Sequence, residues 1–301
     1  MAATVALVGG AGGVGASTAL NLLLCDEPLD VVVIDRRPEK VASHVMDLEQ
    51  VLALGGTRSV RAGTLDDLGE ADVVVVSAAT PLSANTSRLA YLGANAEILG
   101  RVADALPRAW DGVLVVVTNP VDPLVGWLRD RVGLDRRRVL GYSFNDTLRL
   151  RTGVALALGV EVRAVEAWVL GEHGDAAVPI FSRLRVRGVP ATLDASRRGA
   201  AADFVRTWYR RHVALDPGRS STWTSGVGVA RMVRALVRDG SEPWVASVVL
   251  EGEYGVDGVA VGVPVRLGQG GAEVLEWELD EAELRGLHAA AAVVRAASLS
   301  L

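Results

Sequence analysis

The sequence predicts an α/β fold, with a doubly wound parallel sheet in the first half of the chain and an α+β domain in the second. Two observations carry this prediction. Short runs of β-branched residues, typical of strands buried on both faces, alternate with longer helical patterns, and a glycine-rich turn follows the first run. The pattern changes after about Tyr142. A chain of 301 residues is long enough for two domains, which we place at residues 1–142 and 143–301.

The individual elements follow from the hydrophobic pattern. In the first domain we expect strands at residues 5–8, 31–34, 73–76 and 114–117, joined by crossover helices at 14–24, 39–54, 87–106 and 123–132. In the second domain we expect a helix at 146–158, strands near 165–170 and 183–187, and helices near 197–213 and 225–238. Strands near 244–252 and 259–267 and a last helix at 281–297 complete the chain.

Composition excludes several classes of protein. With 31 basic and 36 acidic residues the formal net charge is -5, so the dispersed arginines do not form the basic face that nucleic-acid binding needs. The single cysteine, Cys25, excludes an internal disulfide framework, and the single lysine, Lys40, disfavours Schiff-base chemistry. No apolar stretch approaches the ~18 residues of a membrane span, and no basic leader precedes the first strand. We therefore expect a cytoplasmic protein that is neither inserted in a membrane nor secreted.

The glycine-rich turn indicates a dinucleotide site. Residues 9–15 read Gly-Gly-Ala-Gly-Gly-Val-Gly between the first strand and the first helix, and they satisfy the G-x-G-x-x-G pattern of a Rossmann-type fold. Glycines let a pyrophosphate approach the helix N-terminus, where free N–H groups and the positive end of the dipole favour an anion. The residues expected against the cofactor are Gly10, Gly12, Gly13, Val14 and Gly15.

The residue after the second strand favours NAD as the cofactor. Asp35 lies there, 20 residues after Gly15, where a carboxylate can accept hydrogen bonds from the ribose hydroxyls. The same charge repels a 2′-phosphate and so disfavours NADP, although Arg36 and Arg37 could accommodate that phosphate. The loop also fits short-chain dehydrogenases, but no tyrosine of this chain has a lysine four residues later, so that class is excluded.

A second group of residues has the composition of an acid–base site. His173 lies between glycines at the end of an apolar strand, where a histidine faces a cleft rather than a core. Asp146 opens a helix 27 residues earlier, and Arg149, one turn on, shares its face. An aspartate can orient an imidazole and stabilise its protonated form, and an arginine can grip a carboxylate with two parallel hydrogen bonds. The pattern therefore predicts a proton donor beside an anion-binding arginine.

Together these motifs resemble the lactate/malate dehydrogenase family. The glycine loop, Asp35, Thr-Asn-Pro-Val-Asp-Pro at 118–123, the Asp146/Arg149 pair and Gly-Glu-His-Gly-Asp at 171–175 occur in the order and spacing of that family. Segments 250–255 and 263–264 also fit, so the resemblance covers essentially the whole chain. It implies an NAD-dependent L-2-hydroxy acid dehydrogenase without a metal, assembled as a homodimer or homotetramer, with a small 2-oxo or 2-hydroxy acid as substrate.

The resemblance also implies a role for each matching residue. His173 would donate and accept the proton, Asp146 would be its partner, and Arg149 would anchor the substrate carboxylate. Asn119 would contact the substrate and the nicotinamide, and Asn95 would contact the cofactor. Arg88 would polarise the substrate carbonyl from a lid at residues 80–92.

The residue six positions before Arg88 determines the expected substrate. By the resemblance, malate-specific members have an arginine there for a second carboxylate and typical lactate enzymes have a glutamine, whereas this chain has Leu82. Because leucine would leave the second carboxylate of oxaloacetate buried and unpaired, we expect an uncharged substrate side chain, with the small Ser221 leaving room for it. The spacing of residues 141–146 is nevertheless malate-type, and Arg151 could supply the missing charge. Malate dehydrogenase is therefore the alternative.

Two other classes of protein share some of these sequence features. A non-catalytic NAD-binding member of the family is a further alternative, because a fold does not by itself imply a function. Degraded site residues would favour it, and only the specificity position departs from the pattern. A metallohydrolase is disfavoured, because the four histidines are far apart in the sequence and His-Glu-x-x-His does not occur.

Overall fold

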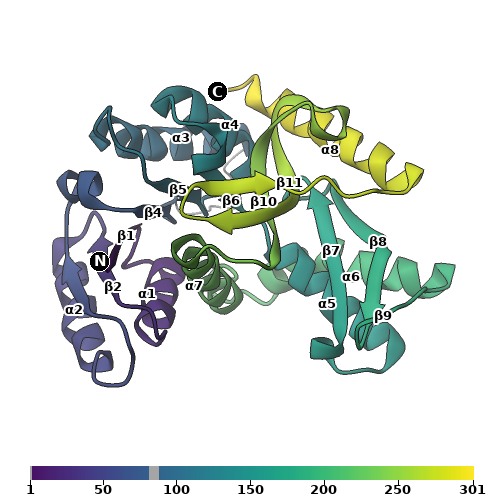
Figure 1. The fold of residues 1–301 in the computed structure, drawn as a ribbon, viewed down its shortest axis with the longest axis horizontal. Helices are drawn as coiled ribbons and strands as arrows, with labels where there is room; N and C mark the ends of the chain where they lie inside the picture. Colours follow the sequence, from purple (N-terminus) through teal and green to yellow (C-terminus); the bar gives the residue numbers. More distant parts are fainter. Residues whose placement is uncertain (1, 81–87) are drawn as a thin grey trace.

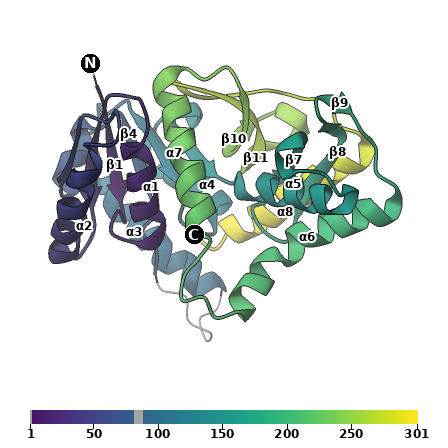
Figure 2. The same ribbon diagram turned by 90° about the horizontal axis from the view of Figure 1, so that it is seen from below.

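The protein is built around one continuous mixed sheet with helices on both faces (Figure 1, Figure 2). The computed structural model describes residues 2–80 and 88–301, and the side chains of residues 88–90 lie outside that description. Among the helices described, none is both long enough and apolar enough to cross a membrane.

The N-terminal half forms the doubly wound parallel sheet that the sequence predicts. Its strands are β1 (Ala3–Val8), β2 (Leu29–Ile34), β3 (Ser59–Ala62), β4 (Val73–Val76), β5 (Val113–Val116) and β6 (Val139–Tyr142). Its helices are α1 (Gly13–Leu23), α2 (Pro38–Val51), α3 (Arg88–Ala105) and α4 (Val121–Val132), with the 3-10 helices η1 (Leu65–Glu70) and η2 (Arg136–Arg138). The parallel order β3-β2-β1-β4-β5-β6 is that of a Rossmann-type dinucleotide-binding sheet.

Two strands of this half are not apparent from the hydrophobic pattern. β3 has four residues, lies at the edge of the sheet and includes the exposed Arg61. β6 also has four residues, and it ends with Gly141 and Tyr142. β4 and β5 are equally short but are unbroken apolar runs, whereas polar residues interrupt β3 and a glycine interrupts β6, so neither of these two strands stands out in the sequence.

The C-terminal half continues the same sheet. Its strands are β7 (Val165–Gly171), β8 (Ala177–Val186), β9 (Val189–Pro190), β10 (Pro243–Glu251), β11 (Asp257–Gly268) and β12 (Gly271–Val274). Its helices are α5 (Asn145–Leu158), α6 (Ala195–Ala214), α7 (Thr222–Arg238) and α8 (Glu281–Ser298), with the 3-10 helices η3 (Val162–Ala164) and η4 (Glu253–Gly255). β10 pairs antiparallel with β6, and the order continues β11-β7-β8-β9, with β12 paired to β11. The strand expected near 183–187 is the second half of β8.

Alternate residues of the central strands enter two different cores. On β4, Val73 and Val75 join the core that includes α1, α2 and α7, whereas Val74 and Val76 join the core that includes α3 and α4. Both faces of the strand are therefore buried, which is why it appears in the sequence as an unbroken run of valines.

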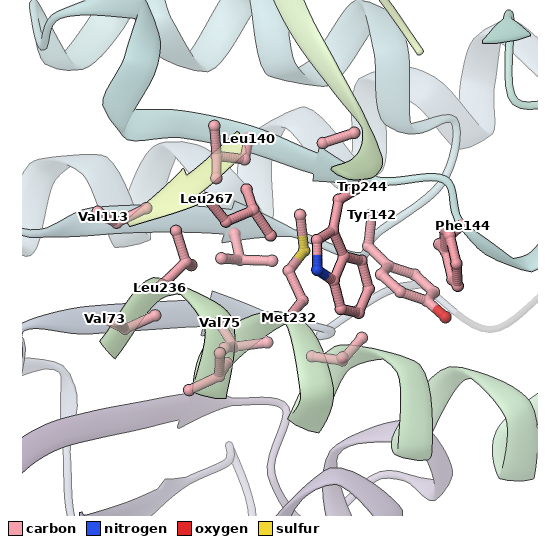
Figure 3. Close-up of a cluster of buried hydrophobic side chains, with 14 of the residues drawn as sticks. Val73, Val75, Val113, Leu140, Tyr142, Phe144, Met232, Leu236, Trp244 and Leu267 are labelled. Atoms are coloured by element: carbon pink, nitrogen blue, oxygen red, sulfur yellow. The ribbon is translucent and has the colours of Figure 1, made fainter. Parts of the chain in front are cut away.

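Helix α7 comes from the C-terminal half of the chain but covers the N-terminal sheet (Figure 3). Its Met232 lies in one core with residues of β4, β5, β6, β10 and β11. Two glycines allow the close approach: a Cβ at Gly226 would lie 2.0 Å from Oγ of Ser17 on α1, and a Cβ at Gly228 would lie 1.8 Å from the hydroxyl of Tyr142 on β6. The two halves are thus interlocked as well as joined through the sheet.

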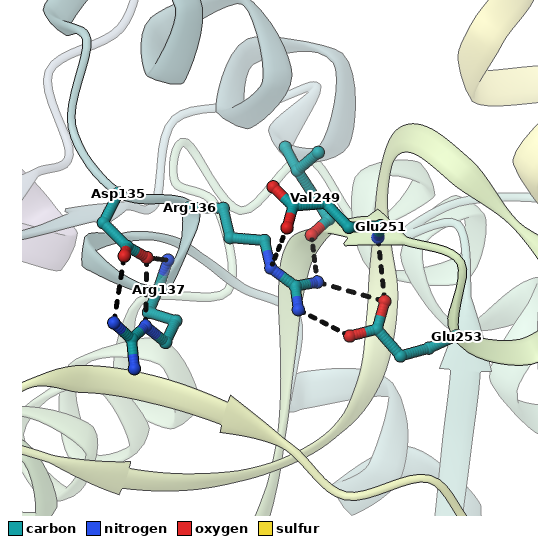
Figure 4. A network of polar contacts seen from close by, with 6 residues as sticks. All are labelled: Asp135, Arg136, Arg137, Val249, Glu251 and Glu253. Atoms are coloured by element: carbon teal, nitrogen blue, oxygen red, sulfur yellow. Dashed lines mark hydrogen bonds and ion pairs between the residues drawn. The ribbon is translucent and has the colours of Figure 1, made fainter.

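A cluster of charged residues also links the two halves (Figure 4). Arg136 in η2 donates from Nη1 to the carbonyl of Val249 at 3.0 Å, and its Nη1 and Nη2 reach the two carboxylate oxygens of Glu253 at 3.0 and 2.6 Å. Its Nε lies 3.2 Å from Glu251. Because Arg136 is half-buried, these contacts hold the turn before β6 against the end of β10.

Candidate active site

The loops that follow β1, β4 and β5 meet at the carboxyl edge of the parallel sheet. Gly9, after β1, has a φ of 84°, and a Cβ on it would lie 2.5 Å from the backbone nitrogen of Ala78, after β4. Thr118, after β5, donates its hydroxyl to the carbonyl of Ala78 at 2.8 Å. In a sheet of this order, ligands bind at this edge, at the point where the connections from β1 and β4 diverge.

Like Gly9, two further positions of the glycine loop leave no room for a larger residue. A Cβ at Gly15 would lie 2.3 Å from the carbonyl oxygen of Gly9, and a Cβ at Gly10 would lie 2.8 Å from the carbonyl oxygen of Leu7. Such a tight turn brings the backbone close to whatever lies in front of α1. It fits the pyrophosphate of a dinucleotide, which needs a backbone free of side chains.

The first turn of α1 is open to an anion. Gly12 is the N-cap and supplies no side-chain cap, so first-turn N–H groups remain available to a phosphate; Gly13 is exposed and Val14 partly exposed. A Cβ at Gly13 would lie 3.1 Å from Oγ1 of Thr222, the first residue of α7. Ser221, which precedes Thr222, therefore lies near the glycine loop.

Asp35 lies beside the same loop. It directly follows β2, and the backbone N–H groups of Gly9 and Gly10 both donate to the carbonyl of Ile34 at 2.9 Å. Its side chain is partly exposed, as a carboxylate that accepts hydrogen bonds from a ribose must be. Arg36 is exposed. The loop and Asp35 together fit the two ends of an adenosine diphosphate moiety.

Asn95 has a structural role in this arrangement. Its side chain is fully buried, Oδ1 accepts from the backbone N–H of Thr80 at 2.8 Å, and Nδ2 donates to the carbonyl of Asn119 at 2.7 Å. It therefore ties the segment after β4 to the segment after β5, where the Asn119–Pro120 peptide bond is cis. Direct contact of Asn95 or Asn119 with the cofactor stays a prediction.

His173, Asp146 and Arg149 form a charged group with little solvent exposure. Nδ1 of His173 lies 2.6 Å from Oδ2 of Asp146, and Nη1 of Arg149 donates to the other carboxylate oxygen at 2.6 Å. The side chains are 14%, 9% and 13% exposed, respectively. The loop after β7 and the first turns of α5 thus bring these three residues together. Because Nδ1 is engaged, Nε2 is the ring nitrogen that can exchange a proton with a substrate.

Burial and pairing act in opposite directions on the pKa values of this pair. Burial lowers the pKa of His173 and raises that of Asp146, because each charged form loses hydration. The attraction between the two groups outweighs burial, and Arg149 also favours the ionised Asp146. The net result is a raised pKa for His173 and a lowered pKa for Asp146, so a protonated imidazole is stabilised beside an ionised carboxylate.

An aromatic ring supports Arg149. The guanidinium carbon lies 4.2 Å from the centroid of Trp208 on α6. A cation over an indole face gains favourable electrostatic energy, and the contact restricts the guanidinium to few orientations. Trp208 is not identified by the sequence pattern, because the contact joins two helices whose relative placement is a tertiary property.

Asp122 also belongs to the site, although the sequence motif assigns it no role. Its Oδ2 accepts from the backbone N–H of His173 at 2.7 Å, and its side chain is 1% exposed. The sequence does contain a signal for it, because Asp122 lies between apolar residues at the start of a helix. An aspartate in such a place is expected to be buried, and buried aspartates are rarely without a partner.

Several predicted site residues fall outside the described residues or point elsewhere. Leu82 and the rest of 81–87, which form most of the predicted lid, are outside, as is the side chain of Arg88, the first residue of α3. Arg151 lies on α5, where its Nε donates to the carbonyl of Ala167 at 3.2 Å and its guanidinium lies 5.0 Å from the ring centroid of Trp168. These contacts hold Arg151 on the β7 side of α5, about 200° around the helix from Arg149.

The fold and the site together define a class of enzyme. A Rossmann-type sheet, a glycine loop that fits a pyrophosphate, and an acid–base pair beside an arginine are the parts of a nicotinamide-dependent dehydrogenase that acts on carboxylic acids.

Comparison with known proteins identifies the family. Residues 3–141 match the family model of the lactate/malate dehydrogenase NAD binding domain, and residues 145–298 match that of the lactate/malate dehydrogenase alpha/beta C-terminal domain. The chain belongs to the lactate/malate dehydrogenase family, and its cofactor is NAD.

Individual relatives include enzymes with both names. The chain is 37% identical to a malate dehydrogenase of Halobacterium salinarum, over 93% of this chain and 94% of that one. It is 33% identical to an L-lactate dehydrogenase of Lactobacillus delbrueckii, over the full length of both. Among solved structures, the minor L-lactate dehydrogenase of Enterococcus mundtii has a TM-score of 0.91 at 28% identity, over 100% of this chain and 98% of that one.

Proposed function

We propose that this chain transfers a hydride between NAD(H) and a 2-hydroxy/2-oxo acid whose side chain is uncharged, lactate-like or longer and apolar. The observation that carries the reaction is the contact of Asp146 with both His173 and Arg149, which joins a proton donor to a carboxylate anchor. The preference for an uncharged side chain rests on Leu82.

The residues of the site divide the chemistry between them. NAD(H), when bound, supplies or accepts the hydride at its nicotinamide ring. In the direction of reduction, His173 gives a proton to the substrate oxygen, and Asp146 holds the imidazolium in orientation until then. Arg149 fixes the substrate by its carboxylate. Arg88 and Asn119 stabilise the negative charge that develops on the substrate oxygen.

The position of Arg151 supports an uncharged substrate. A second carboxylate on the substrate needs a cation, because burying it unpaired costs several kcal/mol. Leu82 supplies none, and Arg151 is engaged with Ala167 and Trp168 on the β7 side of α5. Ser221, near the glycine loop, is small enough to leave space for a larger apolar group.

Malate dehydrogenase is the second candidate. It is favoured by the relative from Halobacterium salinarum, which carries that name and is more similar in sequence than the lactate dehydrogenase of Lactobacillus delbrueckii. The spacing of residues 141–146 also resembles malate-type members.

A substrate panel distinguishes the two candidates. We expect kcat/KM, measured by loss of NADH absorbance, to be highest for one of pyruvate, 2-oxobutyrate, 2-oxoisocaproate and phenylpyruvate. A preference for oxaloacetate above about tenfold, ~1.4 kcal/mol, would identify a malate dehydrogenase instead. Leu82→Arg should shift the ratio toward oxaloacetate by at least about tenfold, and Leu82→Gln, which adds no charge, should not.

One variant separates a catalyst from a non-catalytic NAD-binding protein. His173→Asn should reduce kcat by about 10²–10⁴-fold while NADH binding, followed by fluorescence, stays unchanged. His44→Asn on α2 is the control. Binding of NADH by the unmodified chain without turnover of any 2-oxo acid would support the non-catalytic alternative.

The assembly is a further part of the proposal. From the family resemblance we infer a homodimer or homotetramer, and light scattering on the purified protein should give two or four times the 31.6 kDa of the chain. A mass of one chain at micromolar concentration would contradict this.

A further inference from the structure

Asp122 is a buried carboxylate next to the acid–base pair that the proposed mechanism does not use. It is the second residue of α4, and it lies 51 positions before His173 in the sequence. Its Oδ2 accepts the backbone N–H of His173 at 2.7 Å. Its Oδ1 and the nearby hydroxyl of Ser247 are buried and lack a hydrogen bond of normal geometry within the described part of the chain, although Ser247 lies close enough to favour the charged form of Asp122.

The hydrogen bond alone does not require a carboxylate. A single backbone N–H could be satisfied by the neutral amide of an asparagine, whereas a buried carboxylate with one unpaired oxygen is costly. Burial raises the pKa of Asp122 to about 6, although Ser247 and the His173 N–H oppose the shift. Asp122 is therefore ionised above about pH 6. The protonated His173 and the N-terminus of α4 both offset the cost of its charge.

The charged groups around His173 come from three elements. Asp146 and Arg149 face it from α5, Asp122 from the start of α4, and Glu172 precedes it in the chain. Glu172 is itself buried and accepts from the backbone N–H of Ala176 at 2.9 Å. Asp122 favours the charged imidazole and Arg149 disfavours it, so Asp122 adds to the effect of Asp146.

The surroundings make this charge effective at His173. Asp122 and His173 both line a cavity of about 140 Å³ whose other walls are mostly apolar, including Leu92, Pro123 and Val294. In a region of low polarity, a charge is screened less than it would be in water. The same helix start also follows the segment that carries Asn119, so Asp122 links that segment to the loop of His173.

We propose that Asp122 is a positioning residue for the reaction: it aligns the His173 loop with the segment that carries Asn119, and its negative charge keeps the proton on His173. The role of Asp122 in the reaction rests on the proposed function. Its electrostatic effect on the protonation of His173 does not, and it can be measured without a substrate.

The first test is an NMR titration of the histidine side chains, which needs no turnover. The chain has four histidines, and His173→Asn assigns the signal of interest. In Asp122→Asn we expect the titration midpoint of His173 to fall by roughly half a pH unit or more. Asp130→Asn, an exposed aspartate of the same helix paired with Arg129, should leave it unchanged. An unchanged midpoint in a folded Asp122→Asn protein would overturn the proposal.

The second test uses the best substrate of the panel. In Asp122→Asn, the fall of kcat/KM for reduction with rising pH should begin at lower pH, with KM within about twofold of the parent. In Asp122→Ala, which also loses the hydrogen bond, kcat should fall further. A drop in melting temperature with an unchanged pH profile would indicate a purely structural residue and overturn the proposal. A chain that reduces no 2-oxo acid would overturn the proposed function, while the titration would still decide the role of Asp122.

Discussion

The pKa of His173 is set by two opposing effects, burial and the attraction of a neighbouring carboxylate, which are both weak for a histidine on the surface. Burial alone would favour the neutral ring, which cannot donate a proton to a substrate oxygen. The Asp146 carboxylate at 2.6 Å reverses this preference, and Arg149, bonded to the same carboxylate, keeps it ionised. The arginine that would hold the substrate therefore also stabilises the ionised carboxylate that pairs with His173, although its own charge disfavours the protonated imidazole.

The pH dependence of reduction should follow from this balance. Because reduction needs the protonated His173 and its pKa is raised, kcat/KM should stay constant at low pH and fall as pH rises through that raised value. In Asp146→Asn burial is opposed only by the more weakly acting Asp122, so the fall should begin at lower pH and kcat should drop by at least about tenfold. Asp203→Asn, on the exposed face of α6, is the control. Identical pH profiles for Asp146→Asn and the parent would contradict this explanation.

At the scale of elements, the turn from β1 into α1 depends on glycine for steric reasons. Gly15 has the carbonyl oxygen of Gly9 2.3 Å from where its Cβ would be, and no flexible side chain is there to move away. Not every glycine of the sheet-covering helices is constrained in this way. Gly126, inside α4, has no atom within 4 Å of its Cβ position apart from the neighbouring backbone of its own helix.

These two glycines give a matched comparison. Gly15→Ala should displace the loop and raise the Kd for NADH by at least about tenfold, ~1.4 kcal/mol, as measured by fluorescence titration. Gly126→Ala should leave the Kd unchanged and stabilise the protein by up to about 1 kcal/mol, because alanine is the better helix former. Equal NADH affinity in both variants would show that the loop does not contact the cofactor closely.

At the scale of the whole molecule, the two halves of the chain form one structural unit. β10 pairs with β6, α7 covers the face of the N-terminal sheet, and Arg136 bridges η2 to the region after β10. The predicted acid–base group lies where the halves meet, since the backbone N–H of His173, from one half, donates to Asp122, from the other, at 2.7 Å.

The contribution of Arg136 can be measured against its neighbour. Arg136→Met should lower the free energy of unfolding by about 1–3 kcal/mol, because Glu253 would remain half-buried without its partner. Arg137→Met should cost less than about 1 kcal/mol, since Arg137 is 61% exposed and pairs with the adjacent Asp135. Urea unfolding at a fixed protein concentration measures both. An equal loss in the two variants would argue against a role for the bridge.

Much of the fold was predictable because its signals are local. Buried parallel strands appear as runs of valine, and crossover helices have enough length to be recognised, so the Rossmann-type sheet follows from the sequence. β3 and β6 did not follow, because polar residues in β3 and a glycine in β6 break the apolar run that marks the equally short β4 and β5. The continuous sheet did not follow either, because the pairing of Ala246 with Tyr142 joins residues far apart in the chain.

The sequence by itself determined the fold class, the glycine loop with Asp35, and the candidates His173, Asp146 and Arg149, because each depends on residue type at a fixed spacing within a short segment. The tertiary structure alone decided which groups surround them: Trp208 against Arg149, Asp122 against His173, and Arg151 on the β7 side of α5. These contacts come from elements packed against one another, and a local pattern does not specify how two helices or loops meet. The electrostatics of the site therefore depend on neighbours that become visible only in the folded chain.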